Sequence, residues 1–516
     1  MARFRVVTKH QISGWRFLQR RIEHALVRRD VSMRDDPQQG RSTALMIGLA
    51  LACVGVVGAA VLAFFKPAKL VGNARIVSEK DSGALYVRLG GRLHPALNLT
   101  SARLIVGAAE NPVRVSREEL AKYPRGPWVG IPGAPGQIVD SGDRDSSWTV
   151  CDQAKPGAPL DPATGLPSAA LSPVRTTVIG GPLVVDGATV GELTGAAARL
   201  LRDDTTTWLV YRDSERGVVR ASVSLGNSAV TMALGIDSTA PVLAVSKGFI
   251  NAIPEAPPLR VPDVPGAGEP VTLASGPEVA VGSVLTVPAI DIDRGAAYYL
   301  VSRSGVVRIS SVVAAMVRNA SSQGTVSART VGPDVIAANL RSGTWPGTAS
   351  FPTDPIRLVD PVRIGVTCYR WARGSGDSAS ATVLLAGSRL PLPETALTQT
   401  VSLVTAPASR GATADAVYLP RNTGRFVQVT GTEPDSPRRE SLFWISDSGV
   451  RYGIDANPAE RSDPTLTALN LRNPVVAPWS IVSLFAVGPT LSQRDARIQH
   501  DGIPVNGSAR GLDGTP

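Results

Sequence analysis

The stretch that decides the organisation of this chain is ALMIGLALACVGVVGAAVLAFF, residues 44–65, which contains no charged side chain. Its 22 residues are enough to cross a hydrocarbon core of about 30 Å as a single helix. A cleaved signal peptide is the alternative, but it would have a shorter apolar core and a small-residue cleavage site close behind it. Here a 43-residue basic segment precedes the run, and Lys66-Pro67 closes it. The sequence therefore predicts a membrane anchor over residues 42–66.

The charge distribution around this run predicts the orientation of the chain. Residues 1–41 carry ten Lys or Arg and four Asp or Glu, so the tail contributes +6 of the total net charge of +10. Because Lys and Arg are retained on the cytoplasmic side, residues 1–41 are expected inside and residues 67–516 outside. A basic excess beside a membrane helix is explained by topology and by contact with anionic inner membrane lipid, and it does not call for nucleic acid.

The tail has the pattern of an amphipathic helix between Thr8 and Asp30. Apolar residues recur at steps of three and four, and arginines lie between them. The apolar set is Ile12, Trp15, Leu18, Ile22, Ala25 and Leu26, and the basic set includes Arg20, Arg21, Arg28 and Arg29. Such a helix can lie on anionic lipid, or it can dock on a cytosolic partner with Trp15 and Phe17 as anchors. The sequence leaves both interpretations open.

Three cysteines indicate the compartment of the outer part. Cys53 lies inside the apolar run, whereas Cys151 and Cys368 lie outside it. Two cysteines in an oxidising space most simply pair with each other, and two unpaired buried thiols are the alternative. Neither belongs to a CxxC motif or has a neighbouring histidine, which argues against redox catalysis and a zinc site.

The outer part is predicted to have an α+β fold with internal repeats. One pattern recurs: an apolar strand, a turn containing glycine, and a second strand. Its four copies are residues 84–97, 208–223, 298–312 and 442–455, and three of them are followed by an apolar, helix-like run. The proline-rich segment 253–270 is expected to be an extended connector between two copies.

The sequence carries few signals of catalytic chemistry. A phosphate-binding loop needs a glycine-rich turn followed by a lysine, and none of the seven lysines follows a glycine. The four histidines are His10, His24, His94 and His500, too scattered in sequence to suggest a triad or a metal site. We therefore expect no catalytic residue, metal or cofactor. Exposed aromatics could make a cell-wall binding module, with Trp208, Tyr298, Tyr299 and Trp444 as sugar platforms, although packing in hairpin cores is favoured for them.

Six segments of the chain are distinctive. They are ALYVRLGGRLHPALNLTSARLIVG (84–107), PRGPWVGIPGAPG (124–136), WTVCD (148–152), QISGWRFLQRRIEHALVRRDVSMRDDP (11–37), SLFWISDSGVRYGI (441–454) and APWSIVSLFAVGPTLS (477–492). These segments closely resemble the EccB family, membrane components of the mycobacterial ESX, or type VII, secretion systems. The resemblance covers nearly all of the chain.

The resemblance implies a single-pass inner membrane protein with a cytoplasmic N-terminus. It implies an elongated periplasmic domain of repeated small α/β units around a central β region, with Cys151 and Cys368 at the positions of the family's disulfide. The resemblance further implies a structural subunit that associates with EccC, EccD, EccE and the MycP protease, and with copies of itself. Some members of the family are described as ATPases. Because this sequence lacks a phosphate loop, ATP hydrolysis remains an alternative, with ATP as the one cofactor it would require.

Overall fold

The computed structural model describes residues 8–29, 39–64, 70–154, 174–203, 205–288, 296–325, 327–359, 364–404, 412–457, 460 and 462–503. The chain divides into two compact units, residues 1–69 and residues 70–516. The boundaries predicted within the first unit, at residues 41 and 66, remain a prediction.

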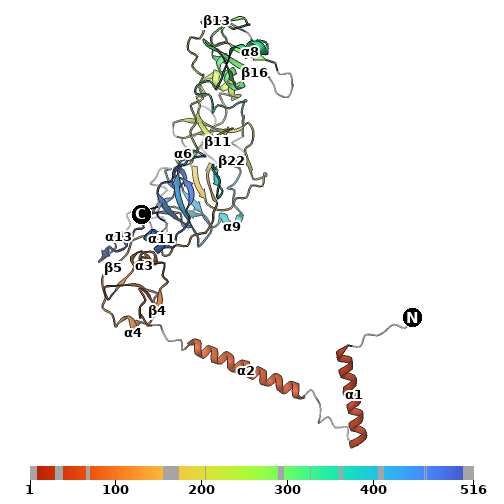
Figure 1. Ribbon diagram of the computed structural model, residues 1–516, viewed down its shortest axis with the longest axis vertical. Coiled ribbons are helices and arrows are strands. Elements are labelled where there is room, and N and C mark those ends of the chain that lie inside the picture. Colours follow the sequence, from red (N-terminus) through yellow and green to blue (C-terminus); the bar gives the residue numbers. More distant parts are fainter. Residues whose placement is uncertain are drawn as a thin grey trace, which may run out of the picture. The chain divides into compact units, whose positions relative to one another are not determined.

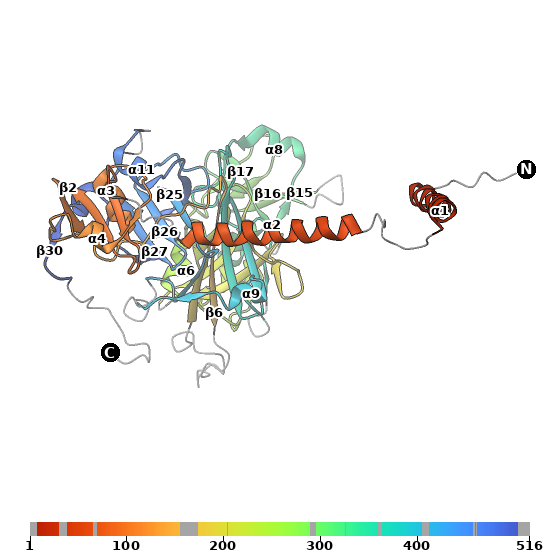
Figure 2. The same ribbon diagram turned by 90° about the horizontal axis from the view of Figure 1, so that it is seen from below.

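The first unit consists of two helices, α1 (Lys9–Arg28) and α2 (Gln39–Phe64). The backbone N–H of Thr8 donates to Gln11 Oε1 at 3.1 Å, which caps the start of α1. Figure 2 shows α2 as one continuous helix. It contains Thr43–Val61, which alone among the described helices is long and apolar enough to cross a membrane. The apolar span predicted from the sequence is therefore helical, and its final residue, Phe65, lies outside the described residues.

The second unit contains one folding pattern four times. Each copy begins with a strand that pairs with the first strand of a β-hairpin, and a helix follows the hairpin. The next strand pairs in parallel with the first strand of the copy. A short helix comes next, after which the chain pairs in parallel with the last strand of the hairpin. All four predicted hairpins are present. We call these copies repeat 1 (residues 76–129), repeat 2 (197–259), repeat 3 (284–341) and repeat 4 (424–491).

Repeats 1 and 4 come from the two ends of this unit. The elements of repeat 1 are β1 (Ile76–Glu79), β2 (Leu85–Leu89), β3 (Arg92–Pro95), α3 (Leu99–Val106), β4 (Val113–Val115), α4 (Arg117–Leu120) and β5 (Trp128–Val129). Those of repeat 4 are β25 (Gly424–Thr430), β26 (Leu442–Ser446), β27 (Val450–Ile454), α11 (Pro464–Leu469), β28 (Val475–Pro478), α12 (Trp479–Val482) and β29 (Ala486–Val487).

Repeats 2 and 3 follow each other in the chain. The elements of repeat 2 are β9 (Ala197–Arg202), β10 (Thr207–Asp213), β11 (Gly217–Ser222), α5 (Ser228–Leu234), β12 (Leu243–Ala244) and α6 (Lys247–Ala252). Those of repeat 3 are β15 (Val284–Val287), β16 (Ala297–Ser302), β17 (Gly305–Ile309), α7 (Ser311–Ala320), β18 (Arg329–Thr330), α8 (Pro333–Asn339) and β19 (Leu340–Arg341).

The helix after each hairpin starts at a residue whose side chain accepts a backbone N–H of the first turn. These N-caps are Asn98, Asn227, Ser310 and Asp463. The sequence predicted helix-like runs after three hairpins, whereas the structure has a helix after all four. The shortest of them, α11, has only 6 residues, and an apolar pattern of that length stands out weakly in a sequence.

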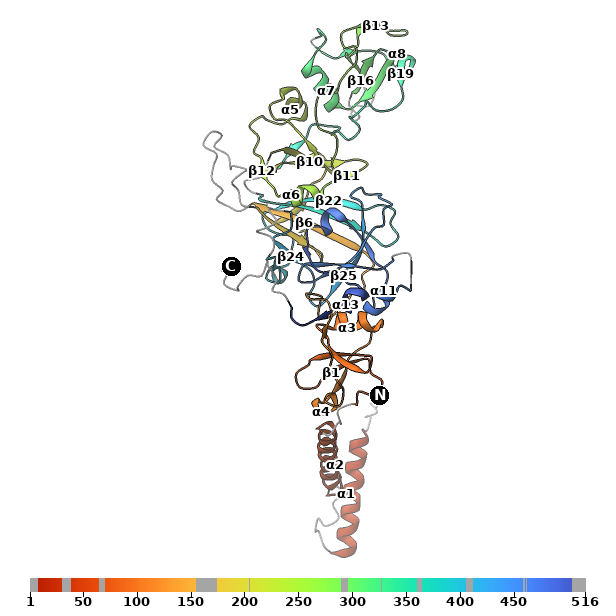
Figure 3. The same ribbon diagram turned by 90° about the vertical axis from the view of Figure 1, so that its left-hand side faces the viewer.

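The repeats pack in pairs through these helices. Helix α3 of repeat 1 contacts α11 of repeat 4, and α5 of repeat 2 contacts α7 of repeat 3 (Figures 1 and 3). Each pair buries a common apolar core: Leu104 and Leu469 belong to one, and Leu234 and Met316 to the other. Each repeat thus covers the apolar helix face of another, as expected for units that cannot bury that face alone.

The central sheet has seven strands, which come from two segments of the chain, one before repeat 2 and one after repeat 3. Its strand order is β23-β24-β7-β6-β21-β22-β8. Three strands precede repeat 2, namely β6 (Ser146–Ala154), β7 (Val174–Ile179) and β8 (Val190–Glu192). Four follow repeat 3, namely β21 (Val366–Arg373), β22 (Ala381–Gly387), β23 (Val401–Ser402) and β24 (Ala416–Tyr418). The expected central β region flanked by small repeated units is thus confirmed.

Two hairpin glycines let repeats 2 and 4 approach this sheet closely. Gly217 has φ 75°, and a Cβ there would lie 2.3 Å from Thr382 Oγ1 on β22. Gly449 has φ 82°, and a Cβ there would lie 2.3 Å from Val417 Cγ2 on β24. Glycine is required in these two hairpin turns for two reasons: it adopts the positive φ without strain, and it leaves room for the side chain of the sheet.

The remaining elements connect or cover these parts. They are β13 (Pro270–Thr272), β14 (Glu278–Ala280), β20 (Arg357–Leu358), α9 (Glu394–Leu397), α13 (Gln493–Ala496) and β30 (Gln499–His500). The proline-rich segment 253–270 links repeats 2 and 3 as predicted, and its first part also packs against repeat 2. Ile253, Ala256 and Leu259 are buried, and Glu255 and Leu259 form parallel bridges to residues 220 and 223.

Candidate functional site: the two faces of the central sheet

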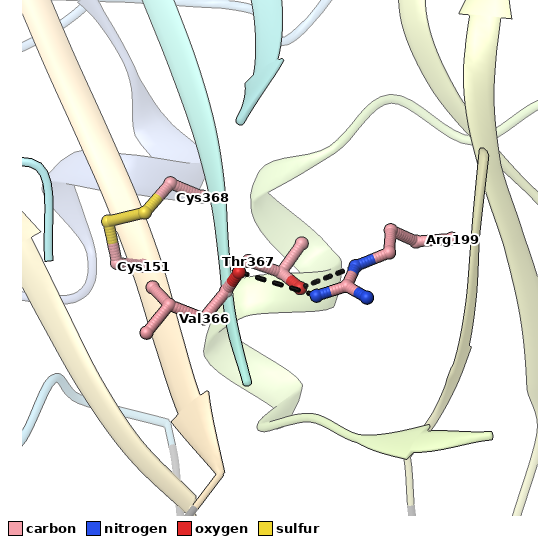
Figure 4. Close-up of a disulfide and its surroundings, with 5 residues drawn as sticks. All are labelled: Cys151, Arg199, Val366, Thr367 and Cys368. Atoms are coloured by element: carbon pink, nitrogen blue, oxygen red, sulfur yellow. Dashed lines mark hydrogen bonds between the residues drawn. A yellow bond between two sulfur atoms is a disulfide. The ribbon is translucent and has the colours of Figure 1, made fainter. Parts of the chain in front are cut away.

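The predicted disulfide is present and joins two neighbouring strands of the central sheet. Cys151 on β6 lies directly opposite Cys368 on β21, with 4.0 Å between their Cα atoms. Both side chains are fully buried, and Figure 4 shows the bond between their sulfur atoms. The bond spans 217 residues of sequence, a stretch that includes repeats 2 and 3.

Strand alternation gives the sheet two different faces. We call the face with the two cysteines the stapled face; it carries a small apolar cluster with Ile179, Val366 and Leu385. Ala396 of α9 belongs to the same cluster and helps to cover it. Residues one position along each strand point the other way, to what we call the docking face.

On the docking face three buried polar side chains lie side by side. Thr176, Asp152 and Thr367 are direct partners across β7, β6 and β21, and each is at most 2 % exposed. We call them the polar row. Because buried polar groups are costly unless they are hydrogen-bonded, the row requires partners from whatever covers this face. Those partners come from repeat 2.

Arg199 of β9 is the first partner. Its side chain is 1 % exposed, and its Nε donates to Thr367 Oγ1 at 3.2 Å. The guanidinium also donates to the carbonyl oxygens of Val359, Ile364 and Val366 at 3.3, 2.5 and 3.4 Å. Figure 4 shows Arg199 approaching β21 from the side opposite the disulfide. This arginine fixes the chain that returns from repeat 3 to the strand that carries Cys368.

Ser246, the N-cap of α6, is the second partner. Its backbone N–H donates to Asp152 Oδ2 at 2.6 Å and its hydroxyl donates to Oδ1 at 3.2 Å. Thr176 Oγ1 donates to Ser246 Oγ at 2.8 Å, and the backbone N–H of Thr176 donates to Asp415 Oδ2 at 2.7 Å. Burial raises the pKa of Asp152 to about 7; its hydrogen bonds with Ser246 and Thr176 oppose this shift and the charge of Asp415 adds to it.

Repeat 4 covers the apolar remainder of the docking face. Phe485 packs edge-on against Trp148, with 5.6 Å between ring centroids and 76° between planes. Both residues belong to one buried cluster that also contains Tyr369 and Trp371 of β21. An ion pair between Arg216 and Glu433, at 2.7 Å, joins the hairpin of repeat 2 to the β25–β26 loop. Repeat 2 also contributes apolar residues to this cluster, among them Val218 and Phe249. The docking face thus holds repeat 2 by polar and apolar contacts and repeat 4 by apolar contacts with its aromatic rings.

A cavity of about 580 Å³ lies between α6 and repeat 4. Lys247, Asn251, Arg438, Glu440 and Trp479 are among its lining residues. Its volume would admit a nucleotide-sized ligand. Two of its loop amides are already engaged, because the N–H groups of Gly431 and Arg438 both donate to Ser436 Oγ, at 3.2 and 3.4 Å. In the part of the chain that the structure describes, no cluster of three or more His, Cys, Asp or Glu residues could hold a metal ion.

The predicted contact residues of the tail lie on α1 or at its end. Arg20, Arg21 and Arg28 are exposed along the helix, and Arg29 forms its C-cap with φ 51°. Trp15 is 65 % exposed and Phe17 is 37 % exposed. Trp15 and Phe17 are two residues apart in the sequence, which places them about 200° apart around the helix axis. Their rings therefore point to nearly opposite sides of α1 and do not form one anchor. The choice between lipid and protein contact remains a prediction.

The suggested sugar platform does not form from the four aromatics. Trp208 and Trp444 are 8 % and 4 % exposed and pack in different cores, while Tyr298 and Tyr299 are half-buried in repeat 3. The favoured interpretation, packing in hairpin cores, therefore holds for both tryptophans. Trp208 also stacks under Arg220, whose Cζ lies 4.5 Å from the ring centroid.

Asp152, Thr367 and Arg199 were not predicted from the sequence, although the pattern around Asp152 and Thr367 carries a signal. In SSWTVCD the alternation that places Trp148 and Val150 on one face also places Asp152 there. Thr367 alternates in the same way with Tyr369 and Trp371. A polar residue in an otherwise apolar register predicts a buried hydrogen-bonded site.

Comparisons with known proteins cover the whole chain. A family model described as "Type VII secretion system ESX-1, transport TM domain B" matches residues 4–505. "ESX-3 secretion system ATPase EccB3" of Mycobacterium tuberculosis is 39 % identical over 504 residues, covering 96 % of this chain and 90 % of that protein. "ESX-1 secretion system ATPase EccB1" of the same species is 35 % identical over 516 residues, covering 99 % of both.

Two solved structures agree with these matches. A chain of the "intact ESX-5 inner membrane complex" is 32 % identical, with a TM-score of 0.72 and 99 % of both chains covered. The "EccB3 dimer from the ESX-3 core complex" is 36 % identical, with a TM-score of 0.69, and the match covers 82 % of this chain and all of that one.

Proposed function

Since the chain belongs to the EccB family of type VII secretion components, we propose that it is a structural subunit of an ESX inner membrane complex. The observation that carries the proposal is the match of 99 % of the chain, α2 included, to a chain of the ESX-5 complex. The stapled central sheet and the paired repeats give it a large outer scaffold on a single membrane helix.

Purification of the complex from native membranes, with this subunit tagged, tests the proposal. We expect EccC, EccD and EccE to be recovered in fixed proportion to it, together with MycP and further copies of the subunit. Recovery of the tagged chain without these components from intact membranes would contradict the proposal. An untagged strain processed in parallel controls for adhesion to the resin.

The proposed topology places the N-terminus in the cytoplasm and residues 67–516 in the periplasm. The basic tail and the single described apolar span support it. In a Cys53→Ala background, a membrane-impermeant thiol reagent should label Ser508→Cys in intact cells and should not label Gln39→Cys. Labelling of the Gln39→Cys variant would reverse the orientation.

We further propose that this chain does not hydrolyse ATP by itself, although its relatives carry the word ATPase in their names. A triphosphate is normally held by a lysine, a metal ion and several free backbone amides in one rigid loop. The sequence has no such loop, and the amides of Gly431 and Arg438 beside the described cavity are already bonded.

The test is ATP turnover by the purified full chain, with Lys247→Met and Arg438→Met as matched variants of the cavity. We expect any turnover to diminish with each purification step and to be equal in all three proteins. Turnover that survives purification and disappears in either variant would show that the cavity is an ATP site.

A further inference from the structure

Asp152 is an acid buried at the joint between repeat 2 and the central sheet. It is 1 % exposed, and its hydrogen bonds from Ser246 come from the first residues of α6. Helix α6 also contacts β6 directly. The side chain therefore lies where a change in its charge acts on the contact between two parts of the domain.

Charged and titratable groups around Asp152 come from several elements. Asp415, which precedes β24, accepts a hydrogen bond from the backbone N–H of Thr176, the residue opposite Asp152 on β7. Lys247, the first residue of α6, directly follows Ser246. Arg199 of β9 reaches the other side through Thr367. Arg175 of β7 alternates away from Thr176 and bonds Ser402, and β28, which also packs on β6, contributes only Val, Ala and Pro. The carboxylate of Asp152, within the polar row, and that of Asp415, bonded to the Thr176 amide, thus act on each other in a buried site.

We propose that the contact between Asp152 and Ser246 is a proton-dependent joint that holds α6 on the central sheet. With Asp152 protonated, the joint is tight; with Asp152 ionised, a second negative charge lies beside Asp415 in a site without water access, and α6 opens more readily. The proposal concerns a conformational equilibrium within the chain and does not depend on the proposed secretion function.

The direction of the effect follows from linkage. In the closed joint the pKa of Asp152 is raised to about 7. In an opened joint, where water reaches the carboxyl group, it returns to roughly 3.9. Because the closed state binds the extra proton between these two values, closing is favoured at low pH and is progressively lost as the pH rises towards 7. Above about pH 7 both states are ionised and the equilibrium levels off.

Opening of α6 would also alter the described cavity, because Lys247, Gly248 and Asn251 of this helix line one side of it. The opposite side belongs to repeat 4, with Trp479 and Ser483 of α12 and its C-terminal end. The proton on Asp152 would therefore control how closely repeats 2 and 4 approach across this cavity.

Amide hydrogen exchange of the full chain in detergent tests the joint. The readout is the opening equilibrium of peptides that cover residues 246–252, corrected for the intrinsic pH dependence of exchange. In the wild type we expect the opening constant to rise roughly tenfold per pH unit between about pH 5 and pH 7, then to level off. Asp152→Asn keeps an acceptor oxygen for the Ser246 N–H and carries no charge, so its profile should be flat.

Two further variants keep the test decisive. Asp415→Asn removes the neighbouring charge and should move the transition of α6 to lower pH; it carries the test if Asp152→Asn does not fold. Asp186→Asn changes an exposed turn acid and should leave the profile unchanged. A flat wild-type profile between pH 5 and 7, or a pH dependence that persists in Asp152→Asn, would overturn the proposal.

Discussion

The stapled face and the docking face of the central sheet use the same strands but hold their neighbours in different ways. On the stapled face a covalent bond joins β6 to β21 within a small apolar cluster. On the docking face the same two strands present Asp152 and Thr367, which bond to repeat 2, and large aromatic rings, which pack against repeat 4. One face thus secures the sheet itself, and the other secures the repeats to the sheet by contacts that can be weakened one at a time.

The largest difference between the faces should appear when the disulfide is removed. Replacing both Cys151 and Cys368 by Ala frees a closed loop of 217 residues. In a chain-entropy treatment this lowers the free energy of unfolding by roughly 5 kcal/mol. Denaturant unfolding of the full chain, followed by tryptophan fluorescence, measures the change.

Reduction of the wild type should reproduce this loss, and reductant should have no effect on the double variant. A double variant that unfolds at the same denaturant concentration as the oxidised wild type would mean that the sheet is held by the docking face alone.

Arg199→Met should have the next largest effect, on the docking face. It leaves Thr367 and the carbonyls of Val359 and Ile364 without their buried donor. Because hydrogen bonds to charged groups contribute more than neutral ones, we expect a loss of about 3 kcal/mol in the free energy of unfolding.

Arg212→Met, on the adjacent strand, is the matched control for Arg199→Met. Its side chain is 48 % exposed, and its ion pair with Glu192 is 3.6 Å long. Thermal unfolding should show a loss of less than about 1 kcal/mol. If both variants lost the same free energy of unfolding, the buried hydrogen bonds of Arg199 would not contribute more to stability than an exposed ion pair.

Phe485→Leu tests the apolar half of the docking face. The ring is fully buried against Trp148, and leucine keeps an apolar side chain while removing the edge-on contact. We expect a loss of about 1 kcal/mol and a change in tryptophan emission. Phe443→Leu, a partly buried ring beside Trp479, should cost less. The opposite order would place the stronger aromatic contact of repeat 4 outside the sheet.

Glu433→Gln should give the smallest effect. It breaks the ion pair that joins repeat 4 to Arg216, whose side chain is 27 % exposed, while that of Glu433 is 53 % exposed. The expected loss is about 0.5 kcal/mol at low salt and should vanish at high salt because the charges are screened. A loss that persists in high salt would assign this contact a larger part in docking than its exposure suggests.

Local sequence patterns predicted the parts of the fold that depend on neighbouring residues. The uncharged run gave the membrane helix, and the hairpins followed from apolar strands around glycine turns. The pairing of Cys151 with Cys368 followed from composition, because these are the only cysteines outside the apolar run.

Features that depend on distant strands were not predicted. The position of Asp152 opposite Thr367 requires the register of β6 on β21, which lie more than 200 residues apart. The pairing of α3 with α11 depends on contact between segments from the two ends of the second unit. Burial of Trp208 and Trp444 was favoured from their hairpin positions, but the two different cores that bury them include residues from distant segments of the chain and could not be predicted.

The position of the disulfide in the chain has a mechanical consequence. Cys151 precedes repeat 2 and Cys368 follows repeat 3, so the sulfur bond is a covalent shortcut past both. If the chain were pulled between α2 and the end of repeat 4, tension would pass along β6, through the sulfur atoms and into β21. The backbone of repeats 2 and 3 would carry no load, and these two repeats would stay folded under forces that stretch repeats 1 and 4.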